Sequence, residues 1–242
     1  MKTVLVLGAS GDIGSSIVSE LLKNKYRVIA QCFQHSERLV NISAELNVAK
    51  DNLVVFAADL TNANMRKELM ANVSKITTTL HGLVNVIGGG RPCNIRDLDL
   101  DDWDFSLALN LTAPFHCLQL ALPLLERAKG SVINFSSVAA YTGGAFGPHY
   151  ASVKSGILGL TRSAARELGP YGIRVNAISP GPVDTEMTHS LPAEVLKKII
   201  DETPLRRMVT TSEIASAVNY FLDEATSTTG QSLVIDGGRF FN

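Results

Sequence analysis

The sequence predicts an α/β fold: a single doubly wound domain whose seven-stranded parallel sheet carries helices on both faces. Three observations predict it. Short apolar, β-branched runs recur along the chain, longer amphipathic segments separate them, and 242 residues suffice for one buried sheet with two helical layers. Strand alternating with helix implies right-handed crossovers, and therefore parallel strands.

The expected strands are short apolar runs of the kind that is buried on both faces of a sheet. They cover residues 4–7, 27–32, 53–57, 83–87, 131–136, 174–178 and 232–235. Between them, apolar residues recur three and four positions apart, as in Ile13, Ile17 and Leu21, which is the spacing of an amphipathic helix. No linker or compositional break interrupts the pattern, so the predicted domain covers residues 1–242.

The composition limits the classes of partner that the protein can be expected to bind. Twenty-two Lys and Arg stand against 23 Asp and Glu, so no strong field favours nucleic acid or an anionic membrane. Cys32, Cys93 and Cys117 lack metal or dithiol spacing and are interpreted as reduced core thiols of a cytoplasmic protein. The apolar run at residues 4–7 is too short for a signal peptide, and no run approaches the roughly 20 residues of a membrane span. A soluble protein without a metal site is expected.

A glycine-rich turn follows the first expected strand. Residues 8–14 read Gly-Ala-Ser-Gly-Asp-Ile-Gly and lead directly into the first helix. Glycines let backbone amides approach a pyrophosphate, and the positive end of the helix favours the same group. The turn predicts a dinucleotide site; the alternative is an ordinary strand-to-helix turn.

Tyr150 and Lys154 are four positions apart on an expected helix and therefore share one face. A nearby cation stabilises a phenolate and lowers a tyrosine pKa from near ~10, so the pair can exchange a proton with an alcohol or alkoxide. Ser137, thirteen positions earlier, ends an expected strand, where its hydroxyl can bond a substrate carbonyl.

In order and spacing these motifs resemble the compact branch of the short-chain dehydrogenase/reductase family over essentially the whole chain. The matching stretches are residues 8–14, 59–60, 85–88, 110, 137, 150 with 154, 180–181 and 229–238. The resemblance implies a Rossmann-type fold and an NAD(P)-dependent enzyme that moves hydride between the nicotinamide and a carbonyl or alcohol.

The resemblance also implies roles for four catalytic residues. Tyr150 would be the general acid/base, and Lys154 would lower its pKa and hold the nicotinamide ribose. Ser137 would orient the carbonyl. Asn110 would bend a helix around a water that links the lysine to solvent; alternatively, it only satisfies helix backbone.

The same resemblance implies a set of cofactor contacts. They are Gly8, Ser10, Gly11, Asp12, Ile13, Gly14, Asp59, Leu60, Asn85, Gly88, Tyr150, Lys154, Pro180, Gly181, Val183 and Thr185. Asp59 would accept from the adenine amino group or, alternatively, cap the next helix. Asn85 would brace the central strands.

The chain departs from the family pattern at two places. Asp12 stands where the middle glycine is usual, and Val86 and Ile87 replace smaller residues near the expected adenosine site. His149, beside Tyr150, matches no motif and is interpreted as a wall of the substrate pocket or as surface.

Two other function classes share parts of the pattern. A non-catalytic NAD(P)-binding regulator would not need all of Asn110, Ser137, Tyr150 and Lys154. Sugar-nucleotide epimerases and dehydratases share the Tyr and Lys spacing, but about 60 residues after Gly181 are too few for a nucleotide-sugar domain.

The substrate class is less tightly specified. A variable segment at about residues 186–208 is expected to cover the substrate. Within the family the chain most resembles the 3-oxoacyl-acyl carrier protein reductases. A 3-oxoacyl thioester, carried by acyl carrier protein, is therefore one expected substrate. Basic side chains that could meet such a carrier are Arg127, Lys129, Arg162 and Arg166.

The end of the second expected strand predicts the cofactor preference. Cys32 stands where NAD-preferring members place an acid, so the barrier to NADP is absent. Ser10, Gln34, His35, Ser36 and Arg38 are the donors for a 2′-phosphate, and a modest preference for NADP over NAD follows. By resemblance the assembly is a homotetramer, with interfaces at residues 111–125, 157–168 and 239–242.

Overall fold

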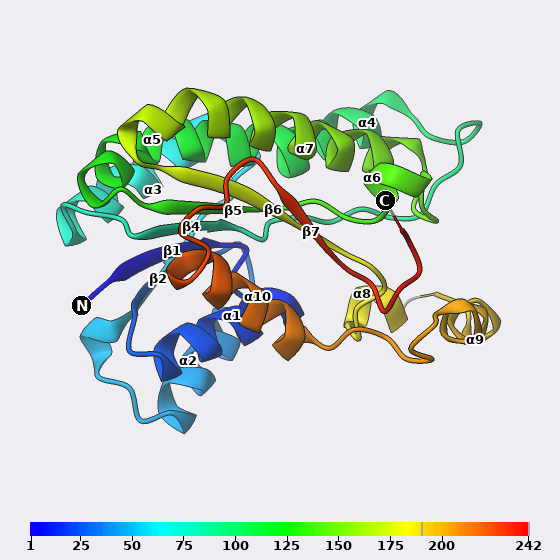
Figure 1. The fold of residues 1–242 in the computed structure, drawn as a ribbon, viewed down its shortest axis with the longest axis horizontal. Helices are drawn as coiled ribbons and strands as arrows, with labels where there is room; N and C mark the ends of the chain where they lie inside the picture. The colour runs from blue at the N-terminus through cyan, green and yellow to red at the C-terminus, as the bar shows by residue number, and fades with distance from the viewer. Residues whose placement is uncertain (190, 242) are drawn as a thin grey trace.

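The computed structural model describes residues 1–189 and 191–241 and contains a seven-stranded parallel sheet of order β3-β2-β1-β4-β5-β6-β7 (Figure 1). The strands are β1 (Thr3–Leu7), β2 (Arg27–Cys32), β3 (Leu53–Ala57), β4 (Gly82–Asn85), β5 (Ser131–Phe135), β6 (Arg174–Pro180) and β7 (Ser232–Ile235). The α/β class predicted from the sequence is confirmed. Because the strand order reverses between β1 and β4, the carboxyl ends of these two strands form the crevice where such sheets bind ligands.

Helices cover both faces of the sheet (Figure 1). One face carries α1 (Asp12–Lys23), α2 (Ser36–Glu45) and α10 (Thr211–Asp223), and the other carries α3 (Ala63–Ile76), α4 (Leu100–Leu107), α5 (Ala113–Ala128) and α7 (Pro148–Leu168). The shorter helical segments are η1 (Lys50–Asn52), η2 (Ala108–Thr112), α6 (Ala139–Thr142), η3 (Gly169–Tyr171), α8 (Glu186–His189) and α9 (Ala193–Glu202). Helices α8 and α9 lie beyond the carboxyl ends of the strands, in the segment expected to cover the substrate.

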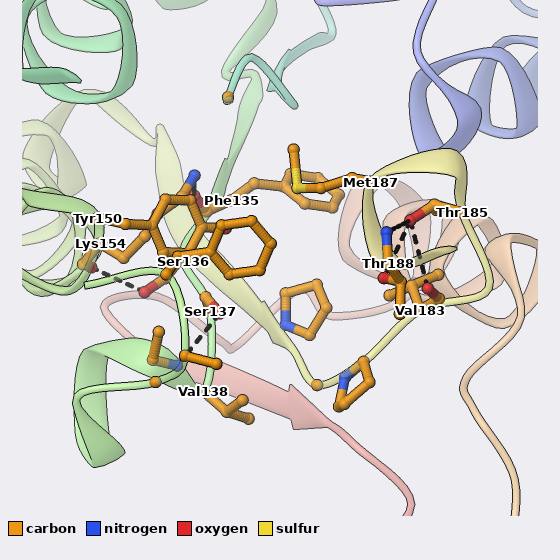
Figure 2. A pocket seen from close by; sticks show the side chains of 18 of the residues that line it. Phe135, Ser136, Ser137, Val138, Tyr150, Lys154, Val183, Thr185, Met187 and Thr188 are labelled. Atoms are coloured by element: carbon orange, nitrogen blue, oxygen red, sulfur yellow. Dashed lines mark hydrogen bonds between the residues drawn. The ribbon is translucent and has the colours of Figure 1, made fainter. Parts of the chain in front are cut away.

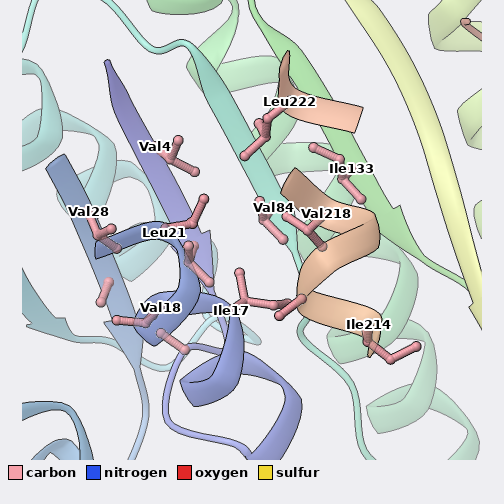
Figure 3. Close-up of a cluster of buried hydrophobic side chains, with 14 of the residues drawn as sticks. Val4, Ile17, Val18, Leu21, Val28, Val84, Ile133, Ile214, Val218 and Leu222 are labelled. Atoms are coloured by element: carbon pink, nitrogen blue, oxygen red, sulfur yellow. The ribbon is translucent and has the colours of Figure 1, made fainter. Parts of the chain in front are cut away.

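Strand β1 shows how the two layers form. Val4 (Figure 3) and Val6 belong to the core that α1 and α10 cover, whereas Leu5 and Leu7 belong to the core under α3 and α5. All four side chains have no exposed surface. Each buried aliphatic side chain stabilises the fold by about 1.5–3 kcal/mol relative to exposure, so a doubly buried strand ties both helical layers to one element.

Most strand boundaries agree with the sequence pattern, and β4 and β6 differ. The apolar run at residues 83–87 predicts a strand through Ile87, but β4 ends at Asn85 because the chain leaves the sheet there. Strand β6 continues past the expected end at Ile178 to Pro180, which pairs with Ile235 of β7. Both shifts lie at the carboxyl edge of the sheet.

The turn between β1 and α1 requires glycine at two positions. Gly8 has φ +81°, a left-handed conformation that costs little only without a Cβ. A Cβ on Gly14 would lie 2.2 Å from the carbonyl oxygen of Gly8. The first turn of α1 therefore packs directly on the end of β1.

Helices α4, η2 and α5 form one continuous helix, Leu100–Ala128. By length and composition alone it is long and apolar enough to cross a membrane, which corrects the expectation that no segment of the chain approaches such a span. The core helix of a soluble protein passes the same test, and Cys117, Ala121 and Leu125 of this helix are fully buried against the sheet.

Candidate active site

Two adjoining cavities form a groove at the carboxyl edge of the sheet. The glycine-turn cavity has a volume of about 530 Å³ and lies between the β1–α1 turn and the end of β3. The tyrosine cavity, about 210 Å³, lies between β5, α7 and α8 (Figure 2). Both are lined by Ile13, Val86, Gly88, Thr185 and Met187, so one extended molecule can occupy both.

The tyrosine cavity brings together three of the four predicted catalytic side chains. Ser137 follows the end of β5 by two residues, and Tyr150 and Lys154 lie one helical turn apart near the start of α7. All three line the cavity (Figure 2). In the chain Ser137 precedes Tyr150 by thirteen positions and Lys154 by seventeen. The three residues meet because β5 and α7 place them at the same edge of the sheet.

Lys154 is buried, with 3% of its surface exposed. Its Nζ donates to the Phe135 carbonyl over 3.0 Å and lies 5.5 Å from the centroid of the Tyr150 ring, within the range of a cation–π contact. Burial lowers the pKa of this ammonium to about 8 because the charged form loses hydration. Lys154 can therefore give and regain a proton near neutral pH.

Two opposing effects act on the pKa of Tyr150. Burial raises its pKa, and a side-chain hydrogen bond with Ser137 lowers it by less, so the net direction is upward. Lys154 was expected to lower this pKa; in the free protein the loss of hydration outweighs any such effect. The phenol therefore holds its proton and is ready to donate it to a developing alkoxide.

Asn110 lies outside both cavities, in the π-helical turn η2 between α4 and α5. Its Nδ2 donates to the carbonyls of Gly89 (3.0 Å) and Ser106 (3.1 Å), and its Oδ1 accepts from the Gly89 amide (3.2 Å). The residue therefore satisfies helix backbone and also pins the loop after β4. Such π-turns frequently mark functional sites.

The glycine-turn cavity fits a dinucleotide. No side chain caps the start of α1 at Gly11, and a Cβ there would approach only the Gly8 carbonyl, at 3.7 Å. The bare amides of a helix N-terminus bind phosphate. Gln31 holds the turn: its Oε1 accepts from the Gly8 amide (2.9 Å), and its Nε2 donates to the Ala58 carbonyl (2.8 Å).

The expected cofactor residues line the groove with one exception. The glycine-turn cavity is lined by Gly8, Ser10, Gly11, Asp12, Ile13, Gly14, Asp59, Leu60, Gly88 and Thr185, and the tyrosine cavity by Ile13, Gly88, Tyr150, Lys154, Pro180, Gly181, Val183 and Thr185. Asn85 is the exception. Its Nδ2 donates to Asn134 Oδ1 over 2.7 Å, which braces β4 against β5.

The structure separates the two interpretations of Asp59. Asn62, not Asp59, caps α3 by accepting from the Asn64 and Met65 amides. Asp59 instead accepts from the amide (2.9 Å) and hydroxyl (2.7 Å) of Thr61. Its carboxylate thus stabilises the turn that forms the wall of the glycine-turn cavity.

Asp12, the departure from the usual glycine pattern, joins three distant segments. Its Oδ1 lies 2.8 Å from Nη1 of Arg38 on α2, and its Oδ2 accepts from the Glu186 amide at the start of α8 over 2.8 Å. Arg38 also donates to the Ser10 carbonyl over 3.1 Å. Arg38 is consequently held by Asp12 and does not line the glycine-turn cavity.

The structure corrects two expectations about single residues and narrows a third. Cys32 lies in the core with 1% exposure and does not line the groove; Gln31, Phe33, Gln34 and His35 line it instead. Successive strand residues point to opposite faces, which explains the one-residue shift. Cys93, expected in the core, is only partly buried. His149 is not surface, because only 3% of it is exposed, and it lines a third pocket and not the tyrosine cavity.

Other groove residues were not predicted from the sequence, and for Phe105 and Leu109 nothing local distinguishes them. Phe105 of α4 and Leu109 of η2 reach the glycine-turn cavity. Gln31 was recognisable as the one amide in an otherwise apolar buried strand. Val86 and Ile87, noted as departures from the family pattern, line the same cavity.

Comparison with known proteins agrees with this geometry. Residues 8–239 match a family model described as enoyl-(acyl carrier protein) reductase. The chain is a short-chain dehydrogenase/reductase. A 3-oxoacyl-[acyl-carrier-protein] reductase of Staphylococcus aureus is 32% identical over 99% of this chain and 98% of its own length.

Two further relatives show the breadth of the family. A trans-4-hydroxycyclohexanecarboxylate dehydrogenase of Sinomonas cyclohexanicum is 32% identical over 98% of this chain and 92% of its own. A short-chain dehydrogenase/reductase variant of Serratia marcescens, solved as a structure, has a TM-score of 0.91 at 30% identity, covering 98% of this chain and 97% of that one.

Membership of this family determines the class of reaction. As a short-chain dehydrogenase/reductase, the chain is an NAD(P)-dependent oxidoreductase. Its similarity to reductases and dehydrogenases along their whole length agrees with the enzyme prediction, whereas neither the regulator nor the sugar-nucleotide alternative finds support.

Proposed function

We propose that this short-chain dehydrogenase/reductase reduces a carbonyl group held between Ser137 and Tyr150, and oxidises the corresponding alcohol in reverse. The observation that carries the proposal is that Ser137, Tyr150 and Lys154 line one cavity that continues into the glycine-turn cavity. When bound, the nicotinamide cofactor supplies or accepts the hydride.

The protein's own groups handle the proton and the orientation. The Ser137 hydroxyl bonds the substrate oxygen, and the Tyr150 phenol gives that oxygen its proton as the charge develops. Lys154, with its pKa lowered to about 8, returns a proton to the phenolate. In the oxidation direction each transfer runs backwards.

The walls of the tyrosine cavity favour an apolar substrate. Val138, Phe146, Met187, Leu191 and Ile199 surround the catalytic groups with hydrocarbon. Apolar walls with few polar groups orient a substrate through its one carbonyl. We therefore propose 3-oxoacyl thioesters, the class named in the Staphylococcus aureus relative, with cyclic hydroxy acids as the competing class.

The expected docking patch for acyl carrier protein needs correction. Arg127 lies in the last turn of α5 and Lys129 directly follows that helix, just before β5 begins at the amino edge of the sheet. Arg162 and Arg166 lie in the later turns of α7 and line neither cavity. Within one chain these four residues do not border the groove, so a carrier protein would have to contact other groups.

A panel experiment tests the reaction and the cofactor together. We expect turnover of 3-oxoacyl thioesters with NADPH to exceed that with NADH by about tenfold in kcat/KM, a difference of about 1.4 kcal/mol. NADPH is favoured because the residues after β2 that line the groove, Phe33, Gln34 and His35, include no acid that would repel its 2′-phosphate. The preference stays modest because Arg38 is held by Asp12. Equal or better use of NADH would contradict the preference, and inactivity on every ketone would contradict the reaction.

We further propose a cytoplasmic homotetramer. Phe115, in the expected interface segment 111–125, is 47% exposed, and a large exposed apolar side chain on a helix suits a subunit interface. In the C-terminal tail Phe240 stacks on Tyr141 and Phe241 is exposed; Asn242 lies outside the described residues. Sedimentation velocity at micromolar concentration should give one tetrameric species, and a stable monomer would contradict the proposal.

A further inference from the structure

Hydrogen bonds and an ion pair join the two walls of the groove through Asp12. We call this arrangement the clasp and define it as the side chains of Asp12 and Arg38 together with the backbone amide of Glu186, the first residue of α8. Asp12 Oδ2 accepts from that amide over 2.8 Å, and Asp12 Oδ1 lies 2.8 Å from Arg38 Nη1. The clasp therefore connects the glycine turn to a segment 174 positions later in the chain.

The clasp lies beside the junction of the two cavities. Ile13, the neighbour of Asp12, lines both cavities, and so do Thr185 and Met187, the neighbours of Glu186 (Figure 2). Asp12 itself lines the glycine-turn cavity. The bond between Asp12 and the Glu186 amide consequently bridges the groove where any molecule that occupies both cavities must extend from one to the other.

The segment on the far side of the clasp has little apolar packing of its own. No residue of α8 or α9, within their described ranges, is buried. The Thr188 amide donates to Thr185 Oγ1, a bond within the same segment. His189 Nε2 likewise lies 2.6 Å from Asp184 Oδ1. Elements with few buried contacts open at low cost, so the bond to Asp12 is a large part of what attaches α8 to the glycine turn.

The contacts of the clasp differ in strength. The side chain of Asp12 is only 20% exposed, and its bond to the Glu186 amide is charge-assisted. Arg38 is fixed on the turn because it also donates to the Ser10 carbonyl over 3.1 Å. Its remaining contact, 3.6 Å to Glu186 Oε1, involves a carboxylate that is 87% exposed and adds little. Asp12 therefore makes the bond that spans the groove, and Arg38 orients Asp12 for it.

We propose that the clasp is a gate for the cofactor: it holds α8 closed over the middle of the bound dinucleotide and opens each time the cofactor enters or leaves. The inference rests on the proposed function, in which one dinucleotide extends through both cavities. Asp12 and Arg38 are positioning residues that take no part in hydride or proton transfer. Because the bond must break for passage in either direction, one opening step limits both association and dissociation.

Stopped-flow mixing with NADPH, followed by nicotinamide fluorescence, tests the gate without any substrate. Asp12→Ala should raise both the association and the dissociation rate constant by about 10- to 100-fold, the factor expected from one hydrogen bond to a carboxylate. The clasp consists of the protein's own groups, so Kd should change little. Faster dissociation with unchanged association would make Asp12 a contact of the bound cofactor and overturn the proposal, as would two unchanged rates.

A matched pair of variants at residue 186 isolates the amide. Proline lacks the N–H and suits the first position of a helix, and Thr185 occupies the capping position before it. Glu186→Pro should therefore reproduce the faster rates, whereas Glu186→Ala keeps the amide and should keep the wild-type rates. Equal rates in these two variants would overturn the proposal, and this comparison stands even if Asp12→Ala does not fold.

Arg38→Met separates the clasp from recognition of the 2′-phosphate. Because Arg38 acts through Asp12, dissociation of NADPH and of NADH should become faster by the same factor, with no further increase in the double variant with Asp12→Ala. Faster dissociation of NADPH alone would assign Arg38 to the 2′-phosphate and overturn the clasp. Wild-type protein that binds neither cofactor would overturn the proposed function and the gate together. Wild-type protein that binds cofactor but reduces no ketone would overturn the proposed function, while the rates of the variants still decide on the gate.

Discussion

Replacing Tyr150 by phenylalanine is expected to lower kcat by about 10³-fold, within the range that general acid catalysis supplies. The variant keeps the ring that lines the tyrosine cavity and packs 5.3 Å from the Phe146 ring, centroid to centroid. It loses only the transferable proton and the contact with Ser137. Cofactor Kd, measured by quenching of protein fluorescence, should therefore stay unchanged.

Tyr171→Phe is the matched control. Tyr171 lies in η3, is 57% exposed and lines neither cavity of the groove, so its loss of a hydroxyl should leave kcat as it is. Tyr150→Phe enzyme that keeps more than about a tenth of wild-type kcat would remove Tyr150 from the proposed proton-transfer step.

The second large effect is expected from Lys154→Met. Methionine keeps an unbranched apolar chain in the cavity but carries neither charge nor donors, so kcat should again fall by about 10³-fold. Because Lys154 is also proposed to hold the cofactor ribose, the cofactor Kd should rise about tenfold, the effect of losing about 1.4 kcal/mol of binding. Loss of kcat with unchanged Kd would disprove the second of these roles.

The same substitution should stabilise the free protein. In the folded state burial lowers the pKa of Lys154 from the ordinary 10.5 to about 8. Between these values the unfolded chain binds the extra proton, so wild-type stability rises with pH across this window and carries the full penalty below it. Lys154→Met removes the penalty, and after the lost hydrogen bond to Phe135 a net gain of about 2 kcal/mol is expected at pH 7.

Urea unfolding at several pH values measures this gain. The stability difference between variant and wild type should shrink as pH rises from about 8 to about 10.5. Lys75→Met, on the exposed side of α3, serves as the control and should show no such trend. A destabilised Lys154→Met at neutral pH would show that the buried charge is better solvated than its surroundings indicate.

The sequence determined the fold class and the centre of the site. The period of the apolar residues reflects burial on one or both faces of an element, a local property, so β2, β3 and β7 begin and end where the pattern predicts. The Tyr150 and Lys154 spacing and the glycine turn likewise depend on neighbours within a few residues. These features can therefore be predicted from the sequence without knowledge of any long-range contact.

Only the tertiary structure decided which distant groups meet. That Asp12 holds Arg38 and the start of α8, and that Cys32 turns into the core, depends on segments far apart in the chain. The net rise in the Tyr150 pKa and the fall in that of Lys154 come from burial, which local sequence does not specify. His149 could be judged surface or wall from its neighbours alone, and the packing of α7 against the glycine loop made it the buried edge of a third cavity.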